Sequence, residues 1–286
     1  MGSGYRNDLA YGAVFGQNDV VTAAALQVRR PKLGLGPDVP RHWYGGEAFA
    51  THYLDALSSV FPDGEAFFVR SVQRFRDRIE DPALRQAIQG FAGQEGQHSH
   101  QHDLHLTLLD AQGYTALSRM NRAGDSIMRF VNRRLPYFAL ASTAALEHLT
   151  ALLARRILEH ESEFTAPMDP RMGPLWRWHA LEEAEHKSVA FDVLQRVAPS
   201  YLLRVFALLF NSFGLFTEML VRTAYMLWKD GELWRAASWS GGRRFLFGQG
   251  GLLRGLGRDY RAWFRRDFHP NQIDDGALIE SWRARV

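Results

Sequence analysis

Glu182-Glu183-Ala184-Glu185-His186 and Gln94-Glu95-Gly96-Gln97-His98 are the two stretches that say most about the fold of this chain of 286 residues. Each contains a glutamate followed three residues later by a histidine. On an α-helix, residues i and i+3 lie on one face, so each pair can present a carboxylate and an imidazole to the same point. One such pair is common on a solvated helix surface. Two pairs in separate segments predict two helices that face each other across a bundle.

The segments around these two stretches have helical periodicity. Apolar residues recur at spacings of three and four, and alternating β patterns are nearly absent. The sequence predicts helices over 47–60, 62–79, 81–113, 125–163 with a break near Pro136, and 174–197. We therefore expect an all-α fold in one structural domain. It would consist of an irregular arm (1–46), a four-helix bundle (47–198), and apolar and basic helices that pack on the bundle (199–286).

The composition excludes several classes of site. The chain has no cysteine, which excludes disulfides, zinc–thiolate sites, iron–sulfur clusters and cysteine nucleophiles. Its net charge is +3, too weak a field to imply nucleic-acid binding. The first eleven residues are polar and glycine-rich, without the apolar run of a signal peptide. We therefore expect a cytoplasmic protein that does not bind nucleic acid.

Two single glutamates extend the histidine motifs to a candidate metal site. Glu147 lies in a run almost without charge, where an unpaired carboxylate would be costly. Glu65 follows Pro62-Asp63-Gly64. Four carboxylates and two imidazoles suit two iron or manganese ions, with zinc as an alternative. The predicted ligands are Glu65, Glu95, His98, Glu147, Glu183 and His186.

Each single glutamate also has a simpler interpretation. Glu147 would be neutralised by an arginine of its own helix, such as Arg155 or Arg156. Glu65 would be an acid that is favourable near a helix N-terminus.

The ligand order resembles that of ferritin-like di-metal carboxylate proteins, which implies a ferritin-like four-helix bundle. A closer resemblance, over roughly residues 28–275, is to the family called predicted metal-dependent hydrolases. The residues that carry it are Arg41-His42-Trp43, Leu57-Ser58-Ser59, Phe61-Pro62-x-Gly64-Glu65-x-Phe67-Phe68, Gln94-Glu95-x-x-His98-x-x-x-His102, His179-x-x-Glu182-Glu183-x-Glu185-His186-Lys187, Phe191-Asp192 and Phe268-His269-Pro270.

Further histidines lie on the same helical stripes. His179 precedes Glu183 by four residues and His186 by seven. This spacing is similar to that of the di-iron arylamine N-oxygenases, which implies that His179 is a seventh ligand. The alternative is that His179 supports a ligand or is an ordinary core residue. His102 follows His98 by four residues and is a ligand, a supporting residue or a proton relay. We expect His105 to be a surface or packing residue.

A ligating imidazole needs its second nitrogen held by a neighbouring group. Pseudo-symmetry of the two motifs suggests that Glu182 accepts from His98 and that Gln94 accepts from His186. Asp192 is a further candidate for such a supporting role.

The segment Leu202–Trp228 is strongly apolar. Its charge-free run, Val205–Thr217, has 13 residues, short of the roughly 20 that a membrane-spanning helix needs. A fifth bundle helix, a homodimer contact and a membrane-facing surface remain as interpretations. Arginines interleaved with aromatic residues over 243–266 are typical of peripheral membrane contact, and also of a solvated amphipathic helix.

The leading functional hypothesis is a non-haem di-iron oxygenase or oxidase that activates O2 to oxidise an amine or a lipophilic organic substrate. It implies two iron ions and either a separate electron-donor protein or the substrate as reductant. A second hypothesis is a di-metal hydrolase that uses zinc or manganese. A third is an iron-oxidising or metal-holding protein, and a fourth is a purely structural helical protein.

Overall fold

The computed structural model describes residues 26–286, and over this range the chain is helical, which confirms the expected all-α fold. The long helices are α1 (Ala48–Gln73), α2 (Pro82–Ala111), α3 (Ala116–Arg134), α4 (Pro136–Glu159), α6 (Gly173–His186) and α8 (Tyr201–Lys229). The shorter ones are α5 (Glu161–Thr165), α7 (Val189–Val197), α9 (Ala236–Phe247), α10 (Gly257–Ala262), α11 (Gly276–Arg283) and the 3-10 turns Arg76–Arg78 and Pro270–Gln272. The polar N-terminal segment and the first part of the predicted arm lie outside the described residues.

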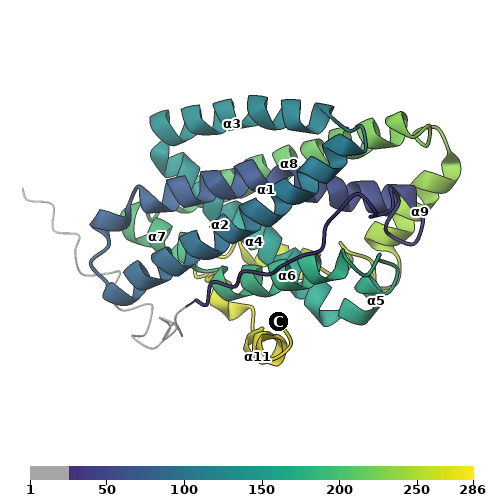
Figure 1. The fold of residues 1–286 in the computed structure, drawn as a ribbon. Helices are drawn as coiled ribbons and strands as arrows, with labels where there is room; N and C mark the ends of the chain where they lie inside the picture. The colour runs from purple at the N-terminus through teal and green to yellow at the C-terminus, as the bar shows by residue number, and fades with distance from the viewer. Residues whose placement is uncertain (1–25) are drawn as a thin grey trace, which may run out of the picture.

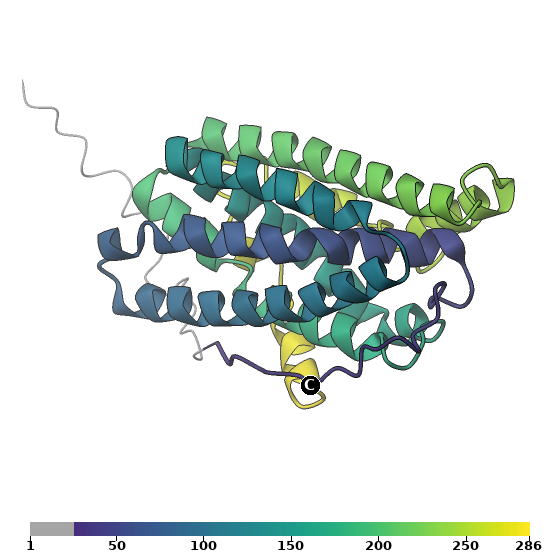
Figure 2. The same ribbon diagram turned by 45° about the horizontal axis from the view of Figure 1, so that its top comes forward.

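The helices that carry the two motifs pack as a bundle (Figures 1 and 2). α1 packs along α2, and α4 packs along α6 and α7. α8 lies against both α1 and α4. Fully buried apolar side chains fill the interior, among them Leu54, Phe91, Leu140 and Leu181. The two Glu-x-x-His motifs therefore enter a closed interior from α2 and α6.

Several predicted boundaries are confirmed, and their local chemistry explains them. Asp81 caps α2 by accepting from the backbone N–H of Ala83, with Pro82 at the first helical position. The turn after α2 contains Gly113 at φ +101°, a conformation that favours glycine. The chain breaks at Pro136 between α3 and α4, as expected, although α3 begins at Ala116 and not at residue 125.

Two predicted boundaries are wrong. Pro62 does not separate two helices but lies inside α1. A proline within a helix costs about 3 kcal/mol, and the buried residues on both sides of it, Leu57 and Phe61 before and Phe67 and Phe68 after, offset this cost. The predicted helix over 174–197 is divided at residues 187–188 into α6 and α7.

The described part of the N-terminal arm runs in extended form across α6 and the adjoining part of α2 (Figure 1). The side-chain amide of Gln101 donates to the carbonyl of Pro31 at 3.1 Å. Gly93 on α2 makes this close approach possible, because a Cβ there would lie 2.6 Å from Val28 Cγ2. The arm therefore covers one side of the interior that holds the motifs.

Within residues 26–286, two helices are long and apolar enough to cross a membrane by length and composition alone. In α4, 72% of the most apolar window is buried, as in a core helix of the bundle. In α8 only 22% of that window is buried. α8 is thus a fifth helix packed on the bundle. Because it also presents a large apolar surface, packing on the bundle alone does not explain why α8 is so apolar.

Candidate metal centre

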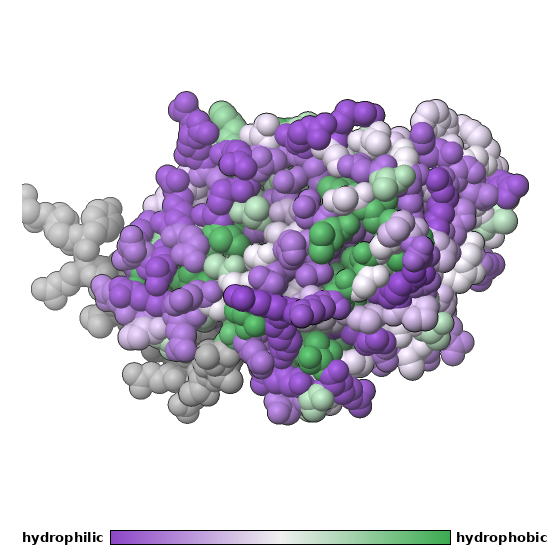
Figure 3. Space-filling model, viewed as in Figure 1, coloured by the Kyte–Doolittle hydropathy of each residue, from purple (hydrophilic) through white to green (hydrophobic). Residues whose placement is uncertain are grey.

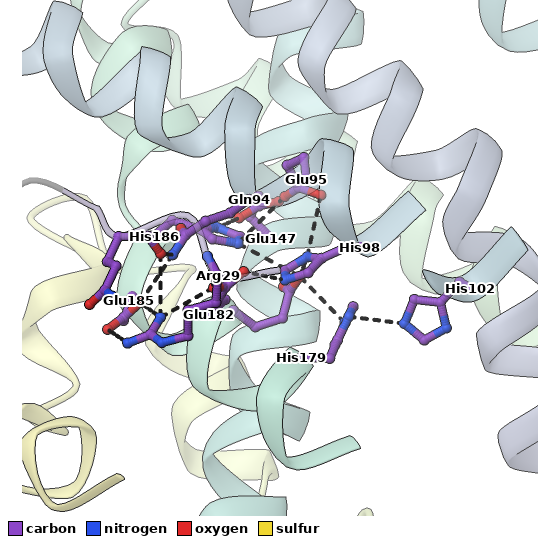
Figure 4. Close-up of polar contacts among 12 residues, drawn as sticks. Arg29, Gln94, Glu95, His98, His102, Glu147, His179, Glu182, Glu185 and His186 are labelled. Carbon is purple, nitrogen blue, oxygen red and sulfur yellow. Dashed lines mark hydrogen bonds and ion pairs between the residues drawn. The ribbon is translucent and has the colours of Figure 1, made fainter. Parts of the chain in front are cut away.

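Four side chains of the two motifs meet in the interior between α2 and α6, and Figure 4 labels three of them, Glu95, His98 and His186. Glu95, His98, Glu183 and His186 each offer one donor atom, and these atoms all lie within 4.8 Å of one another. All four residues are at most 1% exposed. The spacing that predicted one face of each helix therefore does bring both motifs to one point.

The separations within this group suit a shared cation better than direct hydrogen bonds. His98 Nδ1 lies 3.5 Å from Glu183 Oε1 and 3.8 Å from Glu95 Oε2. His186 Nε2 lies 3.6 Å from Glu95 Oε1. Such distances exceed those of hydrogen bonds. Two donor atoms that each lie about 2.1 Å from one tetrahedral ion are about 3.4 Å apart, close to what is observed.

Many buried polar atoms of this region have no hydrogen-bond partner among the described residues. They are both carboxylate oxygens of Glu65 and of Glu95, one oxygen each of Glu147, Glu182 and Glu183, both ring nitrogens of His98, Nε2 of His179 and Nε2 of His186. Buried polar atoms are almost always satisfied in proteins. Carboxylate oxygens and imidazole nitrogens together are a donor set for iron, manganese or zinc. The residues present therefore fit a metal centre.

The pKa values of Glu95 and Glu65 show the same shortage of positive charge. Burial and the neighbouring Glu147 raise the pKa of Glu95 to about 8. Burial and the charge of Glu95 raise the pKa of Glu65 well above its usual value. Burial opposes ionisation of Glu183, but His98 and His186 beside it hold its pKa below the usual range. Cations in this interior would remove the mutual repulsion of the carboxylates.

Glu147 reaches the group from α4. Its Oε2 lies 2.9 Å from His186 Nδ1, and its Oε1 is buried without a partner. The simpler interpretation, an ion pair with an arginine of the same helix, is wrong. Arg155 pairs with Glu159 and Asp259, and Arg156 donates to the carbonyl of Gly251.

Glu65 reaches the region from the middle of α1. Because α1 runs unbroken from Ala48 to Gln73, Glu65 is not near a helix N-terminus, and the simpler interpretation of this residue is wrong as well. Its carboxylate offers an oxygen within 4.8 Å of donor atoms of His102 and His179. The structure therefore adds one carboxylate from α1 beside the central four.

His179 lies between the central group and His102 (Figure 4). Its Nε2 is 3.5 Å from Glu183 Oε1, and its Nδ1 is 3.0 Å from His102 Nε2. Burial lowers the pKa of His179 to about 3, so the imidazole is neutral, as a metal ligand must be. In this arrangement His102 contacts the candidate ligand His179 and supports it.

Glu182 lies beside His98, as the motif symmetry predicts. Its Oε2 is 3.1 Å from His98 Nε2, the nitrogen that points away from the central group. Its Oε1 accepts from both the backbone N–H and the guanidinium of Arg29, each at 3.2 Å. The N-terminal arm thereby fixes the carboxylate that orients His98.

Two expected supporting residues lie elsewhere. Gln94 does not accept from His186; its amide donates to Glu185 Oε2 at 3.0 Å and to a carbonyl of the arm. Glu147 occupies the Nδ1 side of the His186 ring instead. Asp192, on α7, contacts His269 Nε2 at 2.8 Å and not a candidate ligand.

A series of polar contacts leads away from His179. His102 Nδ1 lies 2.7 Å from the Ser58 hydroxyl, which lies 2.7 Å from His105 Nδ1. All of these side chains are buried. His105 is therefore not a surface residue. It packs against the Trp43 ring at 6.4 Å, as a packing residue would, and it also continues a path of buried polar groups.

The same path reaches the surface. His105 Nε2 lies 3.2 Å from Asp55, and Asp55 lies 3.3 Å from His52 Nδ1. Asp230 then contacts His52 at 2.9 Å and the partly exposed His42 at 2.8 Å. We call His102, Ser58, His105, Asp55, His52, Asp230 and His42 the polar chain. It places polar groups in succession between the buried centre and the surface, although His105 Nε2 contacts Asp55 without a hydrogen bond.

Aromatic side chains surround the central group. Phe91 contacts the His186 ring at a centroid distance of 5.0 Å, and Trp178 contacts the His98 ring at 4.8 Å. Phe61 lies 4.5 Å from the His179 ring. The candidate centre is therefore enclosed by apolar groups that exclude water.

The sequence alone did not indicate several residues that the structure places around the centre. Arg29 lies in an arm that carries no periodic pattern, so nothing pointed to its contact with Glu182. Asp55 and Ser58 have the right helical spacing to share one face of α1, which was the available signal. Nothing in the sequence around Asp230 pointed to the centre, because this residue follows α8, an apolar helix that carries none of the candidate ligands.

Comparison with known proteins gives one match. A sequence model of a protein family, described as predicted metal-dependent hydrolase, matches residues 27–274. No curated protein and no solved structure matches the chain.

Proposed function

Since the chain belongs to the family of predicted metal-dependent hydrolases, we propose that its buried carboxylate and imidazole cluster is the active site of a di-metal enzyme. We further propose that this enzyme activates dioxygen at two iron ions to oxidise an amine or a lipophilic organic molecule. The observation that carries the proposal is the cluster of unpartnered carboxylate and imidazole atoms inside an aromatic enclosure.

The donor set is compatible with iron, and the surroundings of the site favour redox chemistry over hydrolysis. Carboxylates and imidazoles bind iron in both common oxidation states. Bound ferrous iron would supply the electrons that reduce dioxygen. A hydrolase needs water and a polar substrate at the same point, whereas the aromatic rings around His98 and His186 exclude water.

Different residues of the chain would bind the metal ions, orient a ligand and transfer protons. The central group with Glu65, Glu147 and His179 would hold the metal ions. Glu182 orients His98 from outside the group, as such supporting contacts do in metal sites. The polar chain would carry protons between His179 and the surface: hydrogen bonds join its groups from His179 to His105 and from Asp55 to His42, and His105 Nε2 approaches Asp55 at 3.2 Å.

Hydrolysis is the second candidate, favoured by the description of the family that matches most of the chain. In that case zinc or manganese would lower the pKa of a bound water molecule. The two candidates make different demands on the metal: hydrolysis needs no change of oxidation state, and oxygen activation requires one.

The decisive experiment loads the metal-free protein with ferrous iron under anaerobic conditions and records the optical spectrum after mixing with oxygenated buffer. We expect about two iron ions per chain and a transient visible band accompanied by oxygen consumption. The variant Glu147→Gln is the negative control, since it removes one candidate ligand while preserving side-chain shape.

The remaining outcomes each redirect the proposal. Two tightly bound irons that do not react with oxygen would contradict oxygen activation. Failure to retain iron, with tight binding of zinc or manganese, would favour hydrolysis. Oxidation of iron that proceeds to stored ferric ion, with no organic product, would favour an iron-oxidising or metal-holding protein. If the protein binds no metal at all, the outcome would favour a purely structural helical protein.

A further inference from the structure

α8 carries a stripe of large apolar side chains that no other described residue covers. Its members are 47–77% exposed and recur mostly at spacings of three and four: Leu202, Phe206, Leu209, Phe210, Phe213, Phe216, Leu220, Val221 and Trp228. With a rise of about 1.5 Å per residue, the stripe is about 39 Å long. Water-soluble monomers rarely expose a continuous apolar surface of this extent.

The other side of α8 is fixed to the bundle. Arg222 is buried and donates to Ser59 of α1 and to Asn121 of α3. Buried Arg204 donates to backbone carbonyls of Trp263 and Arg265. A helix that spanned a bilayer would have to break these contacts and expose both guanidinium groups to lipid, which is costly. The stripe is therefore one face of a packed helix and not a spanning segment.

Exposed arginines border the stripe along α3. The two helices lie side by side, because the Ala116 N–H donates to Tyr225 and Arg222 donates to Asn121 (Figure 2). At the other end of α3, Phe138 of α4 contacts the stripe residue Phe206 at 5.8 Å. The exposed residues of α3 include five arginines and two large apolar residues: Arg119, Arg122, Arg129, Arg133, Arg134, Ile127 and Phe130.

Arginines also border the opposite edge of the stripe. Ser212 of α8 contacts Tyr260 of α10, next to Arg258, whose side chain is 86% exposed. Arg266 lies over the ring of Tyr201 at 4.7 Å. With about 3.6 residues per turn, Ser212 and Tyr225, a residue of α8 that contacts α3, fall on opposite sides of the exposed stripe. Basic residues therefore flank the apolar stripe on both sides.

We propose that this α3–α8 face docks on the surface of a bilayer rich in anionic phospholipid. The apolar stripe would enter the boundary between headgroups and acyl chains, and the flanking arginines would contact lipid phosphates. Trp234 and Trp239, both exposed near the C-terminal end of α8, are the residue type enriched at that boundary. By contrast, the face in Figure 3 is mostly hydrophilic, with green areas interrupted by purple side chains.

Charge selects a bilayer over a second copy of this chain. The exposed charges of α8 itself are only Glu218 and Lys229, and Glu218 already pairs with Arg222. Two copies joined through their stripes would bring arginine borders together, and the acidic groups there, Asp125 and Asp259, are only 20% exposed and already paired with arginines of their own chain. An anionic lipid surface offers negative charge along the whole border.

The test is sedimentation of the whole metal-loaded protein with vesicles of phosphatidylcholine alone or with added phosphatidylglycerol. We expect binding to the anionic vesicles that weakens as salt rises, and little binding to neutral ones. The double variant Phe213→Ser/Phe216→Ser should abolish binding, whereas Leu104→Ser on α2 should not, although Leu104 is 43% exposed. Arg119→Glu/Arg134→Glu, which changes two exposed arginines of α3, should weaken binding by about tenfold or more, and Arg30→Glu should have little effect.

Several outcomes would overturn the proposal. One is equal binding to both kinds of vesicle, and another is no binding to either. A third is a stable dimer in solution that Phe213→Ser/Phe216→Ser converts to a monomer, which would assign the face to self-association. Unchanged metal content and thermal midpoint in each variant show that it is folded. Docking does not depend on the proposed chemistry, so it can fail while the metal centre is correct.

Discussion

Glu147 is the residue whose environment depends most clearly on a cation. It is fully buried, one of its oxygens has no partner, and burial raises its pKa well above the usual value. We predict that Glu147→Gln lowers bound iron from about two ions per chain to about one or fewer, because the amide is a poor ligand. Metal analysis after dialysis against ferrous iron measures this.

The matched control is Glu159→Gln at the exposed end of the same helix. Glu159 pairs with Arg155 there, so the substitution changes charge equally but leaves the interior intact. Equal iron content in the two variants would exclude Glu147 as a ligand.

Glu182 acts on His98 and would not itself bind the metal. We predict that Glu182→Gln weakens metal binding by about 10- to 100-fold, the usual effect of losing a group that orients a ligand. Competition with a chelating dye measures the affinity. Glu185→Gln is the comparison, since Glu185 shares the contact with Arg29 but has no contact with His98. If both variants bind metal equally well, Glu182 does not orient His98.

Ser58 is the single hydroxyl that joins His102 to His105. We predict that Ser58→Ala leaves iron content unchanged and slows the reaction with dioxygen, because the route for protons is interrupted. Stopped-flow absorbance with iron-loaded protein measures the rate.

Ser59→Ala controls for the loss of a buried hydroxyl on α1, since Ser59 donates to the carbonyl of Ala56 and lies outside the polar chain. An unchanged rate in Ser58→Ala, or the same loss in both variants, would argue against proton transfer through Ser58.

At the scale of elements, Asp230 connects segments distant in sequence. It directly follows α8 and accepts from Arg41 and His42 of the arm, His52 of α1 and Tyr114 after α2. Its side chain is 4% exposed. We predict that Asp230→Asn destabilises the protein by about 3 kcal/mol, as expected when one partner of a buried ion pair is removed. Chemical denaturation measures the loss.

The effect of Asp230→Asn should depend on pH. Burial opposes ionisation of Asp230, but its hydrogen-bond donors hold its pKa below 3.8, so its contribution is lost as pH falls below that value. Burial lowers the pKa of His52, but its contacts with Asp230 and Asp55 raise it above 6.5, so this contribution is lost as pH rises through the raised pKa. The difference from the unsubstituted protein should be largest between about pH 4 and 6.5.

Thermal unfolding of both proteins across this range checks the prediction. Asp267→Asn is the control, because Asp267 is exposed and pairs only locally with Arg265. A difference that stays constant from about pH 3 to pH 9 would show that the charges of this cluster do not contribute as described.

At the scale of the whole molecule, metal binding should stabilise the fold. The candidate ligands come from α1, α2, α4 and α6, so one centre ties four helices together. Free metal at about 100 times its dissociation constant adds about 2.7 kcal/mol, which should raise the thermal midpoint by about 5 °C or more. Calorimetry with and without a chelator measures the shift; no shift despite bound metal would place the metal outside this interior.

Local sequence was enough to predict that the chain is helical, where several of its helices begin, and which residues form the central group. Helical periodicity, the Asp81-Pro82 start and the Glu-x-x-His spacing depend on neighbours within one or two turns, so they can be predicted without the rest of the fold. The burial of Glu147 followed from the apolar residues of its own helix. These features are local, and the structure places each of them as the sequence indicates.

How these elements meet depends on tertiary packing. The contact between Arg29 and Glu182 joins residues 153 positions apart, and no local pattern encodes it. Gln94 does not contact His186 as expected, because Glu147, from a third helix, occupies the Nδ1 side of the His186 ring. Packing on both sides keeps Pro62 inside α1, and the same packing leaves one face of α8 uncovered. Local spacing determines which side chains share a face, but only the packing of helices determines what that face meets.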